Sequence, residues 1–88
     1  MENMPFKESI INSVNHRYFD SNSELKWHWD KEDRWVWVDT ETNWEIQLDN
    51  ELPQQIPNNY AIFVPKHQWH RLIKGSNESC LIKVKKWI

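Results

Sequence analysis

Cysteine and glycine are almost absent from this 88-residue chain, which has one of each, Cys80 and Gly75. A single cysteine excludes an intramolecular disulfide and fits a reducing compartment. With one glycine, the turns have to be formed by Asn, Asp, Ser and Pro. Basic residues are not in excess either. The formal net charge of -2 gives no broad positive field for nucleic acid or a membrane surface.

Long apolar runs are also missing. No apolar stretch approaches the length of a membrane span, and no charged segment followed by an apolar one opens the chain. We therefore expect neither membrane insertion nor secretion, and a cytoplasmic location, in the host if the source is viral. The length predicts one domain over residues 1–88. Tryptophan is abundant, with seven residues, and so rich an aromatic content favours a folded core over disorder.

Apolar and polar residues alternate with a period of two through most of the chain. This pattern predicts strands over residues 25–30, 34–38, 44–48, 60–64, 69–73 and 80–84, with the last reaching as far as Trp87. The segment 49–59 contains two Pro and three Asn, and we expect it to be the longest irregular connection. Short strands separated by regular turns predict an all-β sandwich or barrel.

The N-terminal part gives two alternatives. Residues 1–15 are expected to be an arm or a short helix before a barrel over residues 16–88. Ile10, Ile11, Val14 and Tyr18 have helical spacing, whereas residues 14–19 fit a strand equally well.

Two segments resemble the two motifs of the cupin superfamily. Residues 27–38 (WHWDKEDRWVWV) resemble the first, in which a His-x-His pair ends one strand and a Glu opens the next. Residues 60–72 (YAIFVPKHQWHRL) resemble the second, in which an apolar strand runs into Pro-x-Gly-x-x-His. Pro65 and His70 match that motif, and His67 stands where the family usually has Gly. The resemblance extends over residues 24–86. It implies a small single-domain jelly-roll barrel, similar to short phage-type cupin-like proteins.

The resemblance also implies a candidate metal site. Cupins commonly bind Fe, Mn, Ni or Zn through the two histidines and the Glu of the first motif and the His of the second. His28 and His70 match the first and last ligands, while Asp30 and Arg34 occupy the other two positions. Arg stays protonated and cannot bind a cation, so the implied set is His28, Asp30 and His70. In one alternative a register shift lets Asp33 replace the Glu; in another, Asp30 and Arg34 pair and fill the cavity.

The tryptophans lead to a prediction about partners. If the histidines face inward, strand alternation places five indoles on the opposite face, those of Trp27, Trp29, Trp35, Trp37 and Trp69. An apolar patch of this size needs cover. We expect a homodimer through this Trp-rich face, with the N-terminal segment as an alternative cover. In a third alternative these indoles form the core and the histidines face solvent. Lysines near the C-terminus interleave with Trp87 in a pattern that can stack single-stranded nucleic acid, which the acidic balance disfavours.

Three functions fit these residues. The first is a binding protein for a small polar or anionic ligand, such as a sugar phosphate, nucleotide or carboxylate, with a ligand-sequestering or regulatory role. Its cavity would be lined by His28, Arg34, Trp44 and His70, with Arg34 as the anion clamp. The second is a metal-dependent isomerase or oxygenase that holds its metal through His28, Asp30 and His70. The third is a homodimeric structural or protein-interaction module.

Overall fold

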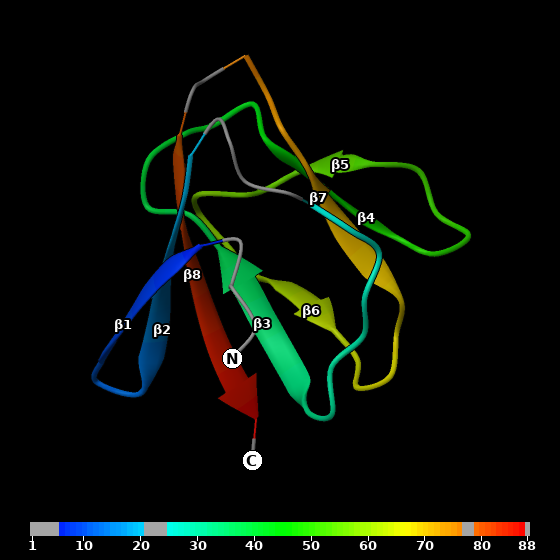
Figure 1. The fold of residues 1–88 in the computed structure, drawn as a ribbon, viewed down its shortest axis with the longest axis horizontal. Coiled ribbons are helices and arrows are strands. Elements are labelled where there is room, and N and C mark those ends of the chain that lie inside the picture. Colours follow the sequence, from blue (N-terminus) through cyan, green and yellow to red (C-terminus); the bar gives the residue numbers. More distant parts are fainter. Residues whose placement is uncertain (1–5, 21–24, 77–78, 88) are drawn as a thin grey trace.

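The regular structure consists of strands alone in the computed structural model, which describes residues 6–20, 25–76 and 79–87 (Figure 1). The strands are β1 (Lys7–Ile11), β2 (Val14–Phe19), β3 (Asp33–Trp37), β4 (Glu45–Leu48), β5 (Gln54–Gln55), β6 (Ile62–Val64), β7 (His70–Ile73) and β8 (Cys80–Trp87). They form an antiparallel five-stranded sheet in the order β1-β2-β8-β3-β6 and an antiparallel three-stranded sheet in the order β5-β4-β7. The predicted all-β jelly-roll architecture is confirmed. None of the described residues belongs to a helix long and apolar enough to cross a membrane.

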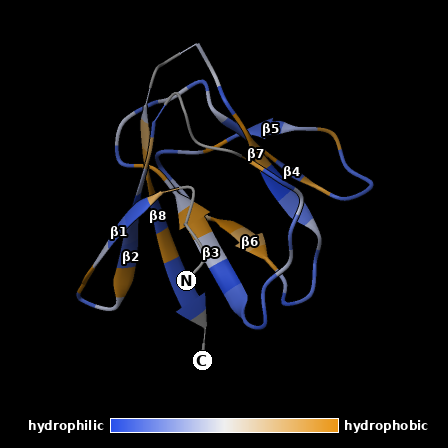
Figure 2. Ribbon diagram, viewed as in Figure 1, coloured by the Kyte–Doolittle hydropathy of each residue, from blue (hydrophilic) through white to orange (hydrophobic). Residues whose placement is uncertain are grey.

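The core lies between the inner faces of the two sheets. Alternation along β8 is visible as successive apolar and polar bands in Figure 2, with Ile82 and Val84 buried and Leu81 exposed. The buried hydrophobic side chains are those of Phe19, Val36, Val38, Trp44, Ile46, Leu48, Ile56, Ile62, Val64, Cys80, Ile82 and Val84. Each large aliphatic side chain removed from water in this way contributes about 1.5–3 kcal/mol. Burial of these alternating positions fixes the register of both sheets, because a slip of one residue would expose them.

A β-hairpin replaces the arm or short helix expected near the N-terminus. The strand alternative for residues 14–19 is confirmed, and the helical alternative is wrong, because residues 7–11 pair with β2 and β2 pairs with β8. The hairpin turns at Asn12 and Ser13, whose φ angles are 52° and 65°. Two successive positive φ angles are typical of the two-residue turn whose twist matches that of the flanking strands.

The predicted strand over residues 25–30 is wrong except at one residue. His28 forms an isolated bridge with His70, in which each backbone N–H donates to the other residue's carbonyl, at 3.0 and 2.8 Å. Two residues later the Asp30 carbonyl accepts a hydrogen bond from the backbone N–H of His67, which has a φ of 65°. This turn geometry ends the ladder. The other predicted strands are found with their ends shifted by up to two residues or, for the last, as far as Trp87, and β5 lies within the segment expected to be irregular.

The five tryptophans expected on one face are divided between the two sheets. Trp35 and Trp37 belong to β3 in the five-stranded sheet, whereas Trp27 and Trp29 flank the bridge to β7 and Trp69 directly precedes β7. Four of them are 38–47% exposed, so the alternative in which these indoles form the core is wrong. The expected single face made of all five tryptophans is also wrong, because they are divided between the two sheets. The homodimer itself stays a prediction.

Candidate metal site

His28, Asp30 and His70 come together where the bridge segment meets the start of β7. One potential ligand atom from each residue lies within 4.8 Å of the other two. The backbone bridge brings the two histidines together, so that their ring centroids are 4.2 Å apart with the planes at 62°. Asp30 lies two residues after His28, and its carboxylate lies beside the two imidazole rings. The convergence that the two motifs imply is thus present in the fold.

Backbone carbonyls fix which ring nitrogen each histidine offers. His28 Nδ1 lies 2.9 Å from the Lys26 carbonyl oxygen, and His70 Nδ1 lies 2.7 Å from the Gln68 carbonyl oxygen. A carbonyl oxygen can only accept, so in both rings Nδ1 carries the hydrogen. In the neutral imidazole Nε2 then holds a free lone pair. This is the arrangement found around metal-bound histidines, in which the second ring nitrogen donates to the backbone or a carboxylate.

The two carboxylate oxygens of Asp30 have different surroundings. Oδ1 lies 3.1 Å from Arg34 Nη1, and both side chains are 12% exposed. Oδ2 lies 3.2 Å from His70 Nε2, but no partner within the described part of the chain meets hydrogen-bond geometry with this buried oxygen. Two positive species can bridge that gap: a proton on Nε2, which pairs a cationic His70 with Asp30, or a metal ion bound to both atoms.

Arg34 is held by two carboxylates. Its Nη1 contacts Asp30, and its Nη2 donates to Glu32 Oε1 at 2.7 Å. Lys86 Nζ lies 3.7 Å from the same Glu32 oxygen. The alternative in which Asp30 and Arg34 pair is therefore present, although the pair leaves Oδ2 free. The charge of Arg34 is compensated by Asp30 and Glu32, but its buried Nε has no hydrogen-bond partner within the described part of the chain. Its role as an anion clamp stays a prediction.

The site favours the protonation states that metal binding requires. Burial lowers the pKa of His28, and the neighbouring His70 and Arg34 lower it further, so this imidazole is neutral near pH 7. Burial alone would raise the pKa of Asp30, but His70 and Arg34 stabilise the carboxylate and hold the pKa below its ordinary value. The hydrogen bond from Arg34 lowers the pKa of Glu32. A neutral imidazole and an ionised carboxylate are the ligating forms of these groups.

Two other predicted residues, Trp44 and Asp33, and the motif residue His67 lie outside the cluster. Trp44 has no exposed surface and packs against Phe19, with ring centroids 6.0 Å apart, so it forms part of the core. Asp33 is not part of the cluster, and its Oδ1 accepts a hydrogen bond of 2.7 Å from the Lys66 backbone N–H. His67 is exposed, and its ring lies 5.3 Å from that of Trp29. Its positive φ explains why the family usually has Gly there.

Glu32 and the two carbonyls at Lys26 and Gln68 were not predicted as parts of the site. The role of Glu32 depends on the direction of the Arg34 side chain, which the sequence does not give. A backbone carbonyl lies two residues before every histidine, so no signal in the sequence distinguished these two.

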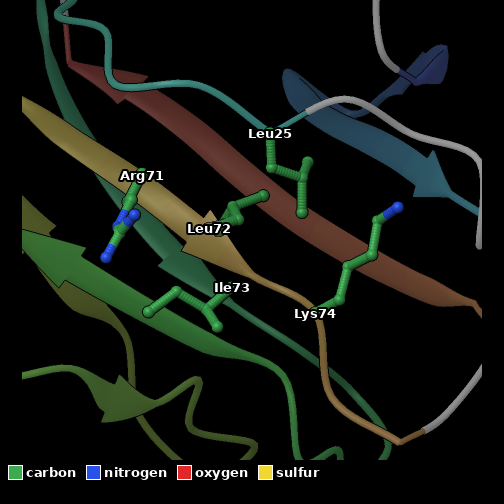
Figure 3. Close-up of a pocket in the computed structure, with 5 residues that line it drawn as sticks. All are labelled: Leu25, Arg71, Leu72, Ile73 and Lys74. Carbon is green, nitrogen blue, oxygen red and sulfur yellow. The ribbon is translucent and has the colours of Figure 1, made fainter.

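A separate hollow of about 410 Å³ opens on the surface beside β7 (Figure 3). It is lined by Leu25, Arg71, Leu72, Ile73 and Lys74, none of which belongs to the His-Asp-His cluster. Leu25 and Leu72 pack against the core. Arg71 donates through Nε to Gln47 Oε1 at 2.9 Å, and its guanidinium lies 4.7 Å from the centroid of the Trp27 ring. The Arg71 guanidinium at this hollow is therefore already engaged within the chain.

Comparison with solved structures shows that the chain has the cupin fold. It is similar to a cupin domain from Bordetella pertussis Tohama I, with a TM-score of 0.67 and 17% identity over 100% of this chain and 99% of that one. A protein from Neisseria meningitidis gives the same TM-score and identity over 100% and 89% of the two chains. The Fe(II) form of HppE in complex with substrate gives a TM-score of 0.64 at 14% identity, over 99% of this chain and 56% of that chain. No protein-family model and no curated protein sequence matches the chain.

Proposed function

We propose that this chain binds a divalent transition metal through His28 Nε2, Asp30 Oδ2 and His70 Nε2, and through that metal a small anionic ligand. The observation that carries the proposal is the buried Asp30 Oδ2, which lies 3.2 Å from His70 Nε2 and has no partner that meets hydrogen-bond geometry within the described part of the chain. A metal ion bound by both atoms, and by His28 from the third side, would satisfy all three groups at once.

The donor set indicates which metals fit. Two imidazoles and one carboxylate suit Fe(II), Mn(II), Ni(II) and Zn(II), and a set of three protein ligands leaves coordination positions open. The fold supports this choice, since the similar HppE structure was determined in its Fe(II) form with substrate. A metal bound here would supply Lewis-acid polarisation of a ligand oxygen.

Arg34 has a second proposed role besides the anion clamp expected from the sequence. Its Nη1 holds Asp30 Oδ1, which orients the carboxylate so that Oδ2 points to the histidines. Residues that hold a metal ligand in this way commonly account for a 10- to 100-fold effect on metal affinity, roughly. Glu32 in turn fixes the guanidinium through Nη2. Both residues therefore position Asp30.

The balance of charge indicates the ligand class. A divalent cation and one Asp30 carboxylate leave one net positive charge at the ion, while Arg34 and Glu32 compensate each other. An anionic oxygen ligand, such as a carboxylate or a phosphate ester, would neutralise this charge. We accordingly propose the same ligand class as the sequence predicts, a small anion, and we propose that the metal binds it.

Metal titration of the purified protein, after treatment with a chelator, tests the proposal. Isothermal titration with Fe(II), Mn(II), Ni(II) and Zn(II) should give one ion per chain. Asp30→Asn should weaken affinity by more than about 100-fold, because it removes the anionic ligand. Asp39→Asn is the matched control, since this carboxylate contacts Lys83, is 63% exposed and does not belong to the cluster. Binding that is absent in the wild type, or equally tight in Asp30→Asn, would contradict the proposal.

The ligand class has its own measurement. In the Co(II)-substituted protein, a small carboxylate or phosphate added to the site should change the visible absorption of the ion, since a ligand enters its coordination sphere. Neutral sugars of similar size should leave the spectrum unchanged. If neutral and anionic compounds change the absorption equally, the proposed preference for an anion is wrong. The proposal of metal binding would not be affected.

A further inference from the structure

The hollow beside β7 forms where the backbone ladder along one edge of that strand ends after a single bridge. His28 and His70 exchange both backbone hydrogen bonds, and within the described residues no further pair continues the ladder toward Leu25 and Leu72. Alternate residues of an antiparallel strand direct their N–H and C=O groups to the same edge, so the backbone of Leu72 faces the edge that His70 uses. Leu25 still packs against the core, and the hollow lies between it and β7.

The hollow has an apolar wall and the size of a small-molecule site. Leu25, Leu72 and Ile73 contribute aliphatic surface, and in Figure 3 these side chains lie between Arg71 and Lys74. Its volume of about 410 Å³ falls within the range of about 300–1,000 Å³ that is typical of small-molecule sites. The apolar part of a small molecule therefore has both room and contact surface here.

Arg71 is held in place without losing its charge. Its Nε donates to the Gln47 side chain, which is neutral, and its guanidinium lies 4.7 Å from the centroid of the Trp27 ring. These contacts orient the guanidinium but do not neutralise it. Within the described part of the chain neither Nη group has a hydrogen-bond partner. A guanidinium in this state can bind a carboxylate through two parallel N–H groups.

The other two arginines of the chain differ from Arg71 in this respect. Arg17 contacts one carboxylate and Arg34 contacts two. Among the residues that the structure describes, Arg71 is thus the one arginine without an acidic partner. An uncompensated cation beside an apolar wall complements a molecule that has one anionic group and an apolar body.

From these observations we infer that the hollow binds a small monocarboxylate with an apolar chain, whose carboxylate contacts Arg71 and whose chain packs against Leu25, Leu72 and Ile73. None of these residues belongs to the His-Asp-His cluster, so this is a second site. The inference does not depend on metal binding. A polyanion fits the hollow less well, because the aliphatic wall offers its further charges no partner.

Octanoate, kept below the concentration at which it forms micelles, is the probe that tests this site. In a titration of the chelator-treated protein followed by ¹H–¹⁵N NMR, the amides of Leu72 and Ile73 and the indole of Trp27 should shift and saturate. Acetate should bind at least about 10-fold more weakly, since it lacks the chain that contacts the apolar wall. The chelator keeps octanoate from binding through a metal at the other site.

Variants separate the contribution of the charge from that of the apolar wall. Arg71→Gln should weaken octanoate binding by about 10- to 100-fold, because it removes a charged hydrogen-bond donor. It should leave the weaker binding of octanol unchanged, since this alcohol has no charge. Arg17→Gln is the matched control: this guanidinium also lies over a ring, that of Phe6, but is paired with Glu8. The NMR spectrum of each variant establishes that the fold is retained.

Four results would overturn the inference. The first is the absence of saturable shifts at the hollow. The second is equal affinity for octanoate in Arg71→Gln and the wild type. The third is octanol that binds the wild type as tightly as octanoate, which would reduce the hollow to an apolar surface. The fourth is a set of shifts confined to His28 and His70, which would place the carboxylate at the His-Asp-His cluster.

Discussion

At the scale of single residues, the site depends on Asp30, whose two carboxylate oxygens have different surroundings. Oδ1 contacts the Arg34 guanidinium, and Oδ2 is left beside His70. In the resembled cupin motif the position of Asp30 belongs to a histidine and that of Arg34 to a glutamate. In the proposed metal site the two departures compensate each other, since the anionic ligand would be Asp30 and the cation that orients it is Arg34.

Replacement of Arg34 tests this compensation. Arg34→Gln should lower the free energy of unfolding of the metal-free protein by about 2–4 kcal/mol, because it leaves the largely buried Asp30 carboxylate without its cation. Urea denaturation in the presence of a chelator measures the change. The double variant Asp30→Asn/Arg34→Gln should regain part of the loss, since no unpaired charge remains. If Arg34→Gln alone denatures like the wild type, the ion pair has no structural role.

The sequence predicted the residues that meet at the site better than it predicted their surroundings. His28 and His70 were found because each lies in a motif beside a strand, and the motifs imply their convergence. Trp44 was expected to line the cavity, and it lies in the core. Its burial depends on Phe19 of the opposite sheet, and the alternation along its own strand indicates only that it points inward. Whether an inward side chain lies in the core or lines a cavity depends on the residues of the opposite sheet that pack against it.

At the scale of elements, the β1–β2 hairpin shows what a local pattern omits. All five residues of β1 are exposed, so no burial pattern distinguishes that strand from an arm. Its turn is formed by Asn12 and Ser13, without the glycine that signals a two-residue hairpin turn. The tryptophans show a second limit. Alternation gives the side of a strand on which Trp35 or Trp69 lies, but not the sheet to which that strand belongs.

The hairpin turn offers a substitution that should stabilise the protein. Ser13 has a φ of 65°, a conformation that glycine adopts without the steric cost paid by other L-residues. Ser13→Gly should therefore raise the free energy of unfolding by about 0.5–1 kcal/mol. Urea denaturation measures it, and Ser9→Gly, within β1, is the control that should destabilise. A loss of stability in Ser13→Gly would show that the turn has a different conformation in solution.

At the scale of the whole molecule, the candidate site connects parts of the fold that otherwise share little regular pairing. The segment with His28 and Asp30 is joined to β7 by one backbone bridge, and to β3 of the other sheet through the Asp30–Arg34 contact. A metal bound by His28, Asp30 and His70 would add three bonds at this junction. Since the unfolded chain does not hold these ligands together, the binding free energy would appear as folding stability.

Metal binding should consequently raise the stability of the entire domain. At a free metal concentration 100 times the dissociation constant, the gain in the free energy of unfolding is about 2.7 kcal/mol, and a chelator should remove it. Hydrogen exchange should show increased protection at the His28 and His70 amides, whose N–H groups form the bridge. Asp30→Asn should lose both effects, whereas Asp39→Asn should retain them. Stabilisation that persists in Asp30→Asn would place the metal elsewhere on the molecule, because the only anionic ligand of the cluster would then be dispensable.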